Sequence, residues 1–587
     1  MSGLLNVEHS VRDQKWVIRA EEGAVEALLQ SSALSPLGAR LIAGRQIAHE
    51  NIDRFLAPKI KDFLPDPSSL TDMDLAVSVI FEAIETGKKI CVFADYDVDG
   101  GTSAAQLLRW ARGLGQDWEL YVPDRLLEGY GPSKKAFERL KSNGVELVIT
   151  VDCGAAAKES LEHAVDIGLD VVVIDHHLMG AERPNAKAIV NPNRQDDVSE
   201  LGHLAAAGVS FMTVIALNRE AKRRDLETHI NPLDLLGLAC LGTICDVVPL
   251  KDLNRAIVKQ GLKVLSRQKN PGVEALADIA NLSPPFTTRD VGFGFGPRIN
   301  AGGRIGVSHM GAELLSTDNA QLAYAHAAEL DRVNTERRAI QERIQAEAMA
   351  EALRLDKDAP VLIIAMDGWH PGIIGIVAGR LKDRFKKPSI VIGLDEEGIG
   401  KGSGRSVKGV NLGDALSQAY QHGLLISGGG HEMAGGLTIK KGKIPDFIVF
   451  MNNYLKASVE TARSNQYLKV DAIIHPNAVS LETLEIIESV GPYGAGNPIP
   501  IFVLSDVSVD YAERLKNGSH IRVNIKSREG HSLRAICFGA DDAGLADILL
   551  SHEKRPLHIA GQISRNEWKG RISANFQILD IAYANSA

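Results

Sequence analysis

The residues best suited to chemistry are acids and histidines in four short segments, each of which follows an apolar run. In chain order they are Asp95, Asp97, Asp99, Asp152, His176, His177 and Asp246. Carboxylates joined by one or two imidazoles suit Mn²⁺ or Mg²⁺ better than metals that prefer thiolate ligands. Two such ions about 3.5–4 Å apart can activate water and stabilise the leaving oxygen when a phosphoester is cleaved. The segments therefore favour a two-metal hydrolytic site.

Each segment has an ordinary explanation when it is taken alone. An Asp at the end of a strand is commonly a helix cap or a turn residue, and the three acids before Gly100 could form a solvated turn. If the backbone there is extended, carboxylates at a spacing of two project to one face. Four strand ends that all carry such groups indicate a shared site, because the carboxyl ends of strands in an open α/β sheet meet at one crevice.

The elements that position these groups lie between Lys88 and Leu250. Helical stretches in this region alternate with β-branched runs at 91–94, 147–151, 171–174 and 188–190. Such alternation is typical of a parallel α/β sheet. We assign this domain to residues 71–312 and treat residues 1–70 as a mixed segment whose role the sequence does not indicate.

Three further regions follow the first domain. No Gly or Pro occurs between Gly311 and Pro360, and apolar residues recur there at threes and fours, which predicts a long connecting helix at 313–358 with Thr317 or Asp318 as its cap. Residues 359–460 have the pattern of a second, glycine-rich α/β domain. Short strands separated by turn residues at 467–587 predict a small β-barrel like an OB-fold. The predicted class is a multidomain α/β protein.

The acidic segments carry a resemblance to a known family. DYDVDG, VDCG, IDHH and CDVVP, in this order, resemble the four motifs of the DHH phosphoesterase family. GPRINAGGRIG, WHPGIIGIVAGRL, GSGRS and GGGHEMAGGL are similar to the RecJ group of that family, the bacterial exonucleases that degrade single-stranded DNA from 5′ to 3′. The likeness runs from about Lys88 to Leu437, and the barrel at the end also fits.

The resemblance implies roles for the acidic and histidine residues. Two Mn²⁺ or Mg²⁺ ions are expected on five metal ligands, which are Asp97, Asp99, Asp152, His176 and Asp246. Asp152 would bridge the two ions. Asp95 and His177 match additional catalytic positions, which are expected to orient water, metal or phosphate.

A second set of residues is expected to bind the substrate. The set contains Arg125, Arg298, Asn300, Arg304, Ser403, Arg405, His431 and Trp568. Guanidinium groups match phosphate oxygens in a bidentate way, although Arg125 could instead pair with Asp124 or Glu128. Ser403 and Arg405 match the family's pocket for the 5′ end. His431 has a plain alternative as a buried histidine, and Trp568 is the best candidate for stacking on a base.

Composition limits the class of protein without identifying it. The 587 residues carry a net charge of −9, so no basic surface points to nucleic acid. Five cysteines without a CxxC pair fit a reducing cytoplasm. No apolar run reaches the roughly 18–20 residues of a membrane helix, and MSGLLNVEHSVRDQKW lacks the pattern of an export signal. We therefore expect a cytoplasmic protein without membrane contact, and a monomer.

Three functions remain open from the sequence. The first is an exonuclease that acts on single-stranded DNA with a 5′ end and releases mononucleotides in DNA repair and recombination, with a helicase and a single-strand-binding protein as partners implied by the family. The second is a DHH enzyme of short oligonucleotides, cyclic dinucleotides or pyrophosphate, which residues 467–587 argue against. The third is a non-catalytic single-strand-binding scaffold, which the intact set of acids argues against.

Overall fold

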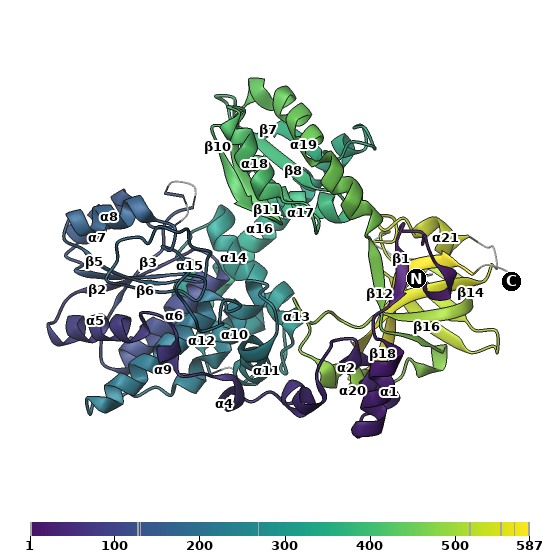
Figure 1. The fold of residues 1–587 in the computed structure, drawn as a ribbon, viewed down its shortest axis with the longest axis horizontal. Helices are drawn as coiled ribbons and strands as arrows, with labels where there is room; N and C mark the ends of the chain where they lie inside the picture. Colours follow the sequence, from purple (N-terminus) through teal and green to yellow (C-terminus); the bar gives the residue numbers. More distant parts are fainter. Residues whose placement is uncertain are drawn as a thin grey trace. The chain divides into compact units, whose positions relative to one another are not determined.

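The computed structural model describes residues 3–125, 128–129, 131–267, 269–515, 518–551, 555–568 and 570–584. The chain divides into two compact units. One unit contains Asp53–Arg338 and Gly491–Pro498, and the other contains Met1–Ile52, Ala339–Val490 and Ile499–Ala587. Both units mix helices with sheets, so the predicted α/β multidomain class is confirmed (Figure 1).

The first unit is built on a parallel sheet of five strands in the order β3-β2-β4-β5-β6. The strands are β2 (Ile90–Ala94), β3 (Glu119–Tyr121), β4 (Leu147–Val151), β5 (Asp170–Ile174) and β6 (Ala188–Val190). Every residue of β2 and β4 is buried. Continuous apolar, β-branched runs are typical of a parallel sheet that is covered on both faces, and the four predicted strands of this sheet are confirmed.

Helices cover both faces of this sheet (Figure 1). Helices α7 (Lys134–Ser142) and α8 (Lys158–Asp166) pack Phe137 and Leu161 against Phe93 on one face. The other face is covered by helices that include α5 (Met73–Glu85), α6 (Val98–Gly113) and α9 (Ala206–Arg223), and α10 (Leu236–Cys245) packs against α6 and α9. Further helices of the unit include α3 (Ile52–Leu56), α4 (Ile60–Phe63), α11 (Asp252–Leu265), α12 (Pro271–Ile279), α13 (Thr288–Asp290), α14 (Gly296–Ile305) and α15 (Met310–Ser316), with a π-helix at Val291–Phe295.

The predicted connecting helix is α16 (Ala320–Ala352). Its cap differs from the prediction, because the side chain of Asn319 accepts hydrogen bonds from the backbone N–H groups of Gln321 (2.9 Å) and Leu322 (3.1 Å). Asp318 pairs with Arg109 at 2.7 Å instead. Neither Thr317 nor Asp318 therefore caps the helix.

The glycine-rich domain contains a mixed sheet in the order β10-β11-β9-β8-β7. Its strands are β7 (Leu362–Asp367), β8 (Ser389–Leu394), β9 (Ile399–Arg405), β10 (Ser427–His431) and β11 (Ala434–Lys440), and its helices are α17 (Pro371–Phe385), α18 (Leu412–Gln421) and α19 (Ile444–Ser464). Along β9 the glycines Gly400, Gly402 and Gly404 are the alternate residues that face the apolar core. Ser403 and Arg405 therefore lie on the opposite face of the strand.

The C-terminal strands close into a five-stranded barrel, as predicted. The strands are β14 (Phe502–Arg514), β15 (Ile521–Lys526), β16 (Ser532–Cys537), β17 (Leu557–Trp568) and β18 (Arg571–Tyr583). Strand β14 pairs with β15 and with β17, and β18 joins β16 to β17, which completes the ring. Strand β13 (Ala472–Ile474) adds to β14, and helices α20 (Leu481–Val490) and α21 (Ala546–Leu550) accompany the barrel.

The N-terminal residues are built into the unit that contains the barrel. Strand β1 (Lys15–Ile18) pairs in parallel with β12 (Tyr467–Val470), and helices α1 (Glu22–Ser31) and α2 (Pro36–Ala43) follow it. Trp16 is fully buried, and its indole Nε1–H donates to Oδ2 of Asp580 on β18 at 3.0 Å. The segment 1–70 is thus shared between the two units, with residues up to Ile52 on the side of the barrel.

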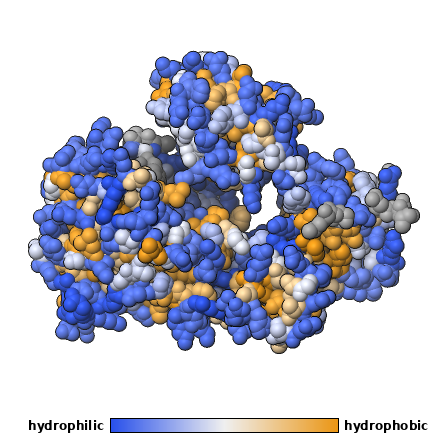
Figure 2. Space-filling view, viewed as in Figure 1, coloured by the Kyte–Doolittle hydropathy of each residue, from blue (hydrophilic) through white to orange (hydrophobic). Residues whose placement is uncertain are grey.

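The face of the molecule in Figure 2 is mainly hydrophilic, and its hydrophobic residues lie in scattered patches. Within the part of the chain that the structure describes, no helix is long and apolar enough to cross a membrane.

Candidate metal centre

The structure brings together all seven acids and histidines singled out in the sequence. They form three overlapping groups, each with its ligand atoms within 4.8 Å of one another: Asp152, His176 and His177; Asp99, His176 and Asp246; Asp95, Asp97 and Asp152. Three of the four segments follow the carboxyl ends of β2, β4 and β5. The fourth was expected at a strand end, and this expectation is wrong because Asp246 follows helix α10. A short apolar run that is wholly buried has no periodicity to separate helix from strand.

The first acidic segment is bent rather than extended, which corrects the expected strand geometry. Strand β2 ends at Ala94, and Asp97 caps helix α6 by accepting hydrogen bonds from the N–H groups of Asp99 (2.8 Å) and Gly100 (3.1 Å). A Cβ atom at position 100 would lie 2.4 Å from the carbonyl oxygen of Asp95. Gly100 therefore lets the helix start directly beside the strand end, so that the three carboxylates gather at one helix N-terminus.

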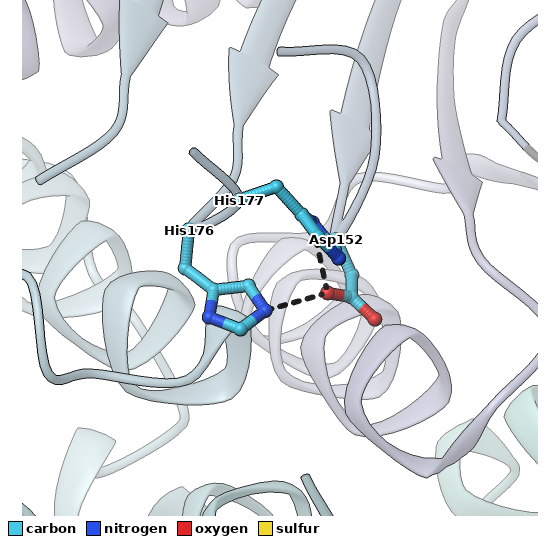
Figure 3. Close-up of side chains that lie close together, drawn as sticks. All are labelled: Asp152, His176 and His177. Atoms are coloured by element: carbon cyan, nitrogen blue, oxygen red, sulfur yellow. Dashed lines mark ion pairs between the residues drawn. The ribbon is translucent and has the colours of Figure 1, made fainter. Parts of the chain in front are cut away.

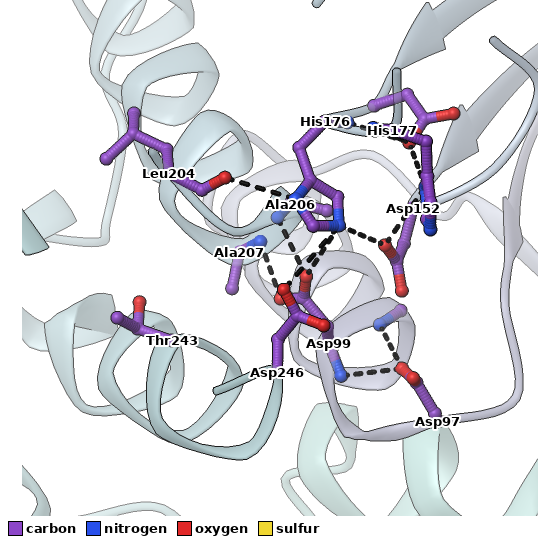
Figure 4. Close-up of polar contacts among 12 residues, drawn as sticks. Asp97, Asp99, Asp152, His176, His177, Leu204, Ala206, Ala207, Thr243 and Asp246 are labelled. Atoms are coloured by element: carbon purple, nitrogen blue, oxygen red, sulfur yellow. Dashed lines mark hydrogen bonds and ion pairs between the residues drawn. The ribbon is translucent and has the colours of Figure 1, made fainter. Parts of the chain in front are cut away.

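Asp99 is held by main-chain donors at the start of helix α9. Its side chain is 1% exposed and accepts hydrogen bonds from the N–H groups of Ala206 (2.7 Å) and Ala207 (2.8 Å), as Figure 4 shows. Burial and the nearby carboxylate of Asp246 nevertheless raise the pKa of Asp99 to about 7. The helix N-terminus fixes the orientation of the carboxylate but does not offset its burial.

His176 is oriented toward the acids by a backbone carbonyl. Its Nδ1 donates to the carbonyl oxygen of Leu204 at 3.1 Å, which leaves the lone pair on Nε2. This Nε2 lies 3.4 Å from Asp152 Oδ1, 3.7 Å from Asp246 Oδ2 and 3.8 Å from Asp99 Oδ2 (Figures 3 and 4). Fixing the tautomer through the second ring nitrogen is the usual way in which a histidine is prepared as a metal ligand.

Asp175 opens the third acidic segment but is not among the predicted site residues, and it supports both histidines. Its buried carboxylate accepts from the N–H groups of Ala155 (2.9 Å), His176 (2.7 Å) and His177 (3.1 Å), and from Nδ1 of His177 (2.7 Å). Burial favours its neutral form, but these donors, the His177 imidazole first, lower the pKa of Asp175 below its usual value. Asp175 therefore acts as the ionised anchor for both histidines. Its position at the end of β5 was the signal available in the sequence.

Two asparagines after strand β6 also support the histidines. Asn191 Nδ2 donates to the carbonyl oxygen of His177 at 2.9 Å, and Asn193 Nδ2 donates to that of His176 at 2.6 Å. The sequence reasoning missed both, although polar residues directly after a predicted strand end were the same signal that identified the acids.

The protonation of the cluster is strongly perturbed. Burial is the largest cause of the raised pKa of Asp95, Asp152 and Asp246, and neighbouring carboxylates add to it; the pKa of Asp246 reaches about 7. Burial lowers the pKa of His177, but its bond to Asp175 and the other acids raise the pKa to about 9. Among the residues described, Asp95 Oδ1 and His176 Nε2 are buried without a hydrogen-bond partner. A cation would relieve both the repulsion and the missing contacts.

Four predicted phosphate contacts lie in the same unit as the acids. The guanidinium of Arg125 lies 5.0 Å from the centre of the Tyr96 ring. Arg298 donates to Asp331 Oδ1 and to the carbonyl oxygen of Gly294, both at 2.8 Å. The residues Asn300 and Arg304 are in helix α14. Asn300 Oδ1 accepts from the N–H of Val98 at 3.2 Å, so that part of its side chain supports the start of α6.

Three predicted substrate residues share one face of the glycine-rich sheet. Arg405 and His431 lie on either side of Ala434 in the strand register, and NH1 of Arg405 donates to Ser403 Oγ at 3.1 Å. A Cβ atom at Gly375 of helix α17 would lie 2.9 Å from Ser403 Oγ. His431 is exposed, so it is not a buried structural histidine. Trp568 ends β17, and its side chain lies outside what the structure describes.

The three parts of the chain match three family models. Residues 89–243 match the DHH family, N-terminal domain; residues 358–457 match the DHHA1 domain; and residues 470–580 match the RecJ OB domain. The parallel sheet with its acidic edge, the glycine-rich sheet and the closed barrel thus define a three-part protein of the DHH class. Asp246 lies just beyond the matched part of the first domain.

Similar proteins narrow this class. The chain is 34% identical over 573 residues to the single-stranded-DNA-specific exonuclease RecJ of Bacillus subtilis, with 97% of this chain and 71% of that protein covered. It is 32% identical to RecJ of Escherichia coli K12, with 93% and 96% covered. The crystal structure of RecJ in complex with Mn²⁺ from Thermus thermophilus superposes with a TM-score of 0.79 at 27% identity, covering 96% of this chain and 78% of that one. The chain belongs to the RecJ family.

Proposed function

We propose that this protein is a metal-dependent exonuclease that degrades single-stranded DNA from its 5′ end. The observation that carries the proposal is the gathering of Asp97, Asp99, Asp152, His176 and Asp246 in one partly buried site, within a chain that aligns with RecJ over 93% of its length. The relatives are named single-stranded-DNA-specific exonucleases. The barrel favours this function over that of a small-substrate DHH enzyme, and the complete ligand set favours it over that of a binding scaffold.

Two divalent ions, Mn²⁺ or Mg²⁺, would be held by the five ligands, with Asp152 shared between them. RecJ from Thermus thermophilus has been crystallised with each of these ions. The residues present fit such ions, because the donors are oxygens and an imidazole, and because burial and neighbouring carboxylates raise the pKa of Asp99, Asp152 and Asp246, which a bound cation would counteract. When bound, the ions supply charge that activates water and stabilises the leaving oxygen of a phosphodiester.

The residues around the ligands position the substrate and its protons. Asp175 orients His177, because its carboxylate accepts from Nδ1 of that imidazole at 2.7 Å. In its protonated form the His177 ring would donate its second N–H to a phosphate oxygen. Asp95 lies beside Asp97 and Asp152, where its carboxylate would accept a proton from attacking water.

The direction of cleavage would be set by the glycine-rich sheet. Ser403, Arg405 and His431 offer a hydroxyl, a guanidinium and an imidazole on one face, a combination suited to a terminal 5′ phosphate. Arg125, Arg298, Asn300 and Arg304 would contact phosphates nearer the ions. The barrel would bind the strand farther along, with Trp568 stacking on a base. Helicase and single-strand-binding-protein partners, and a role in repair and recombination, remain predictions.

The test is a denaturing gel of single-stranded DNA incubated with Mn²⁺ and purified protein. A 3′-labelled strand is expected to give a ladder of shortening products, while a 5′-labelled strand releases its label at once as mononucleotide. Asp97→Asn removes the charge but keeps a good helix cap, and it is expected to abolish the ladder. Ser133→Ala removes the cap of helix α7 without touching the site, so it is expected to leave the ladder intact.

Other outcomes would point to the alternatives. An untouched strand together with cleaved dinucleotides would assign the chain to the small-substrate enzymes. A strand that is bound but survives, with dinucleotides also intact, would leave a non-catalytic binder.

A further inference from the structure

Helix α11 begins between two backbone segments that support the metal centre. Asn254, near its start, is fully buried, and its Nδ2 donates to the carbonyl oxygens of His203 (2.6 Å) and Pro249 (3.0 Å). One amide group thus joins two segments that are 46 residues apart in the chain.

The first of these segments orients two of the proposed ligands. His203 precedes Leu204, whose carbonyl oxygen accepts from His176, and the N–H groups of Ala206 and Ala207 bind Asp99 (Figure 4). The second segment carries Asp246 itself, three residues before Pro249. Asn254 therefore links the segment that carries Asp246 to the segment that holds His176 and Asp99.

The second segment is in turn supported by residues from far along the chain. Gly491–Pro498, between helix α20 and strand β14, belongs to the unit of the metal centre, whereas the residues on both sides of it belong to the other unit. The N–H of Leu250 donates to the carbonyl oxygen of Ala495 at 2.7 Å. A Cβ atom at Gly496 would lie 3.2 Å from Pro249 Cβ, so the two segments touch closely.

Arg255, the neighbour of Asn254, holds this distant segment. Its side chain is almost completely buried and donates to the carbonyl oxygens of Gly491 (2.8 Å), Pro492 (3.4 Å) and Phe55 (2.8 Å). Asn497 closes the segment on itself by donating to the carbonyl oxygen of Pro492 at 2.8 Å. A buried guanidinium bound to main-chain carbonyls fixes backbone position, because losing any of these acceptors would be costly.

We infer that Asn254 and Arg255 are positioning residues of the metal centre, and that Gly491–Pro498 is a structural part of it. Asn254 sets the distance between the two ligand-bearing segments, and Arg255 seats the distant segment behind Asp246. The inference rests on the metal-dependent function proposed above. It extends the centre beyond its ligands to a segment that lies within the matched RecJ OB domain.

The test compares Asn254→Ala with Asn218→Ala in the full-length protein. Asn218 is a buried asparagine of the same unit, and its Oδ1 accepts from Thr228 Oγ1 at 2.8 Å, away from the acids. Mn²⁺ affinity is measured by titration of the free-ion EPR signal, and the Mn²⁺ dependence of cleavage is measured alongside it. Asn254→Ala is expected to weaken Mn²⁺ binding by about 10- to 100-fold, as for other outer supports of metal sites, with cleavage partly restored by excess Mn²⁺. Asn218→Ala is expected to lower stability only.

A second pair of variants tests the distant segment without altering the α11 side chains. Gly496 has φ +75° and meets Pro249, whereas Gly87 has φ +69° with nothing within 4 Å of an added Cβ. Both alanine variants carry the same backbone strain, so only Gly496→Ala is expected to weaken Mn²⁺ binding. Wild-type affinity in Gly496→Ala, and in Asn254→Ala if that variant folds, would overturn the inference. A wild-type protein that binds no Mn²⁺ would instead overturn the proposed function.

Discussion

The Nε2 of His176 lies 3.4 Å from Oδ1 of Asp152, and this contact joins the ends of the neighbouring strands β5 and β4. The carbonyl oxygen of Leu204, which is not a ligand, fixes the imidazole of His176. The backbone of Asp152 adopts the left-handed conformation, with φ 59°. Asparagine and aspartate tolerate that conformation better than most residues do. The ligand side chains are therefore already arranged without an ion. This arrangement is energetically unfavourable because it buries several carboxylates close together.

Asp152→Asn is expected to separate activity from stability. Asn fits the left-handed backbone, and it removes a buried charge whose pKa is raised well above normal by burial and by Asp99 and Asp97. The variant is expected to lose Mn²⁺ binding and cleavage, while its melting temperature in EDTA at pH 8 rises by about 2–4 °C, the shift for about 1 kcal/mol. Thermal denaturation and the gel assay check this. A lower melting temperature of Asp152→Asn in EDTA would show that the charge of Asp152 does not destabilise the fold.

Asp175→Asn is expected to impair the centre although Asp175 is not among the proposed ligands. The amide would turn an N–H toward donors that now bind the carboxylate, so both histidines lose their anchor. Metal affinity or activity is expected to fall by about 10- to 100-fold. Asp170→Asn on the same strand, where the partners are the partly exposed Lys88 and Lys187, provides the control. Equal losses in the two variants would contradict a specific role for Asp175.

Metal binding is expected to stabilise the protein more at high pH than at low pH. In the absence of an ion, burial and neighbouring acids raise the pKa of Asp99 and Asp246 from 3.8 to about 7. A carboxyl with a raised pKa stabilises the fold below its unfolded pKa, and this contribution is lost as the pH rises through the folded value. Mn²⁺ binds the ionised form. The gain in melting temperature with Mn²⁺ is therefore expected to be larger at pH 8 than at pH 5, and an equal gain would contradict this.

Arg405→Ala is expected to weaken recognition of a 5′ phosphate. The wild-type protein is expected to prefer a 5′-phosphorylated strand over a 5′-hydroxyl strand. The variant is expected to lose this preference mainly through a higher KM for the phosphorylated strand, since the charge-assisted hydrogen bond that it lacks is worth about 1.5–3 kcal/mol. Lys441→Ala, which breaks an exposed pair with Asp367 in the same domain, serves as control. An unchanged preference in Arg405→Ala would exclude Arg405 from the 5′ site.

Trp16→Phe is expected to destabilise the barrel. Phenylalanine keeps much of the packing but removes the N–H that binds the buried Asp580, at a cost of about 1–3 kcal/mol. Hydrogen exchange of peptides from β17 and β18 measures the change locally. Trp118→Phe is the control, because among the described residues the Trp118 indole N–H has no hydrogen-bond partner. Exchange that is no faster in Trp16→Phe would contradict the role given to this bond.

The sequence was most informative where local pattern and chemistry coincide. Continuous β-branched runs predicted β2, β4 and β5, and the acids that follow them predicted the site. Asp246 was assigned to the end of a strand because the ten-residue helix before it is almost entirely buried and apolar, and so has no polar face. The proposed contribution of Gly491–Pro498 to the metal centre could not be predicted from the sequence. It depends on main-chain carbonyl groups, which every residue type has. The bond between Trp16 and Asp580 spans 564 residues, far beyond the reach of any periodicity.

That long separation has a consequence for biosynthesis. At about 5–20 residues per second on the ribosome, the 564 residues between Trp16 and Asp580 separate their synthesis by about half a minute to two minutes. Strand β1 has no strand partner until β12 (Tyr467–Val470) has been made, and Trp16 has no bond to Asp580 until the end of the interval. A chain whose synthesis stops early therefore displays an open strand edge and an uncovered tryptophan, features that chaperones and proteases act on.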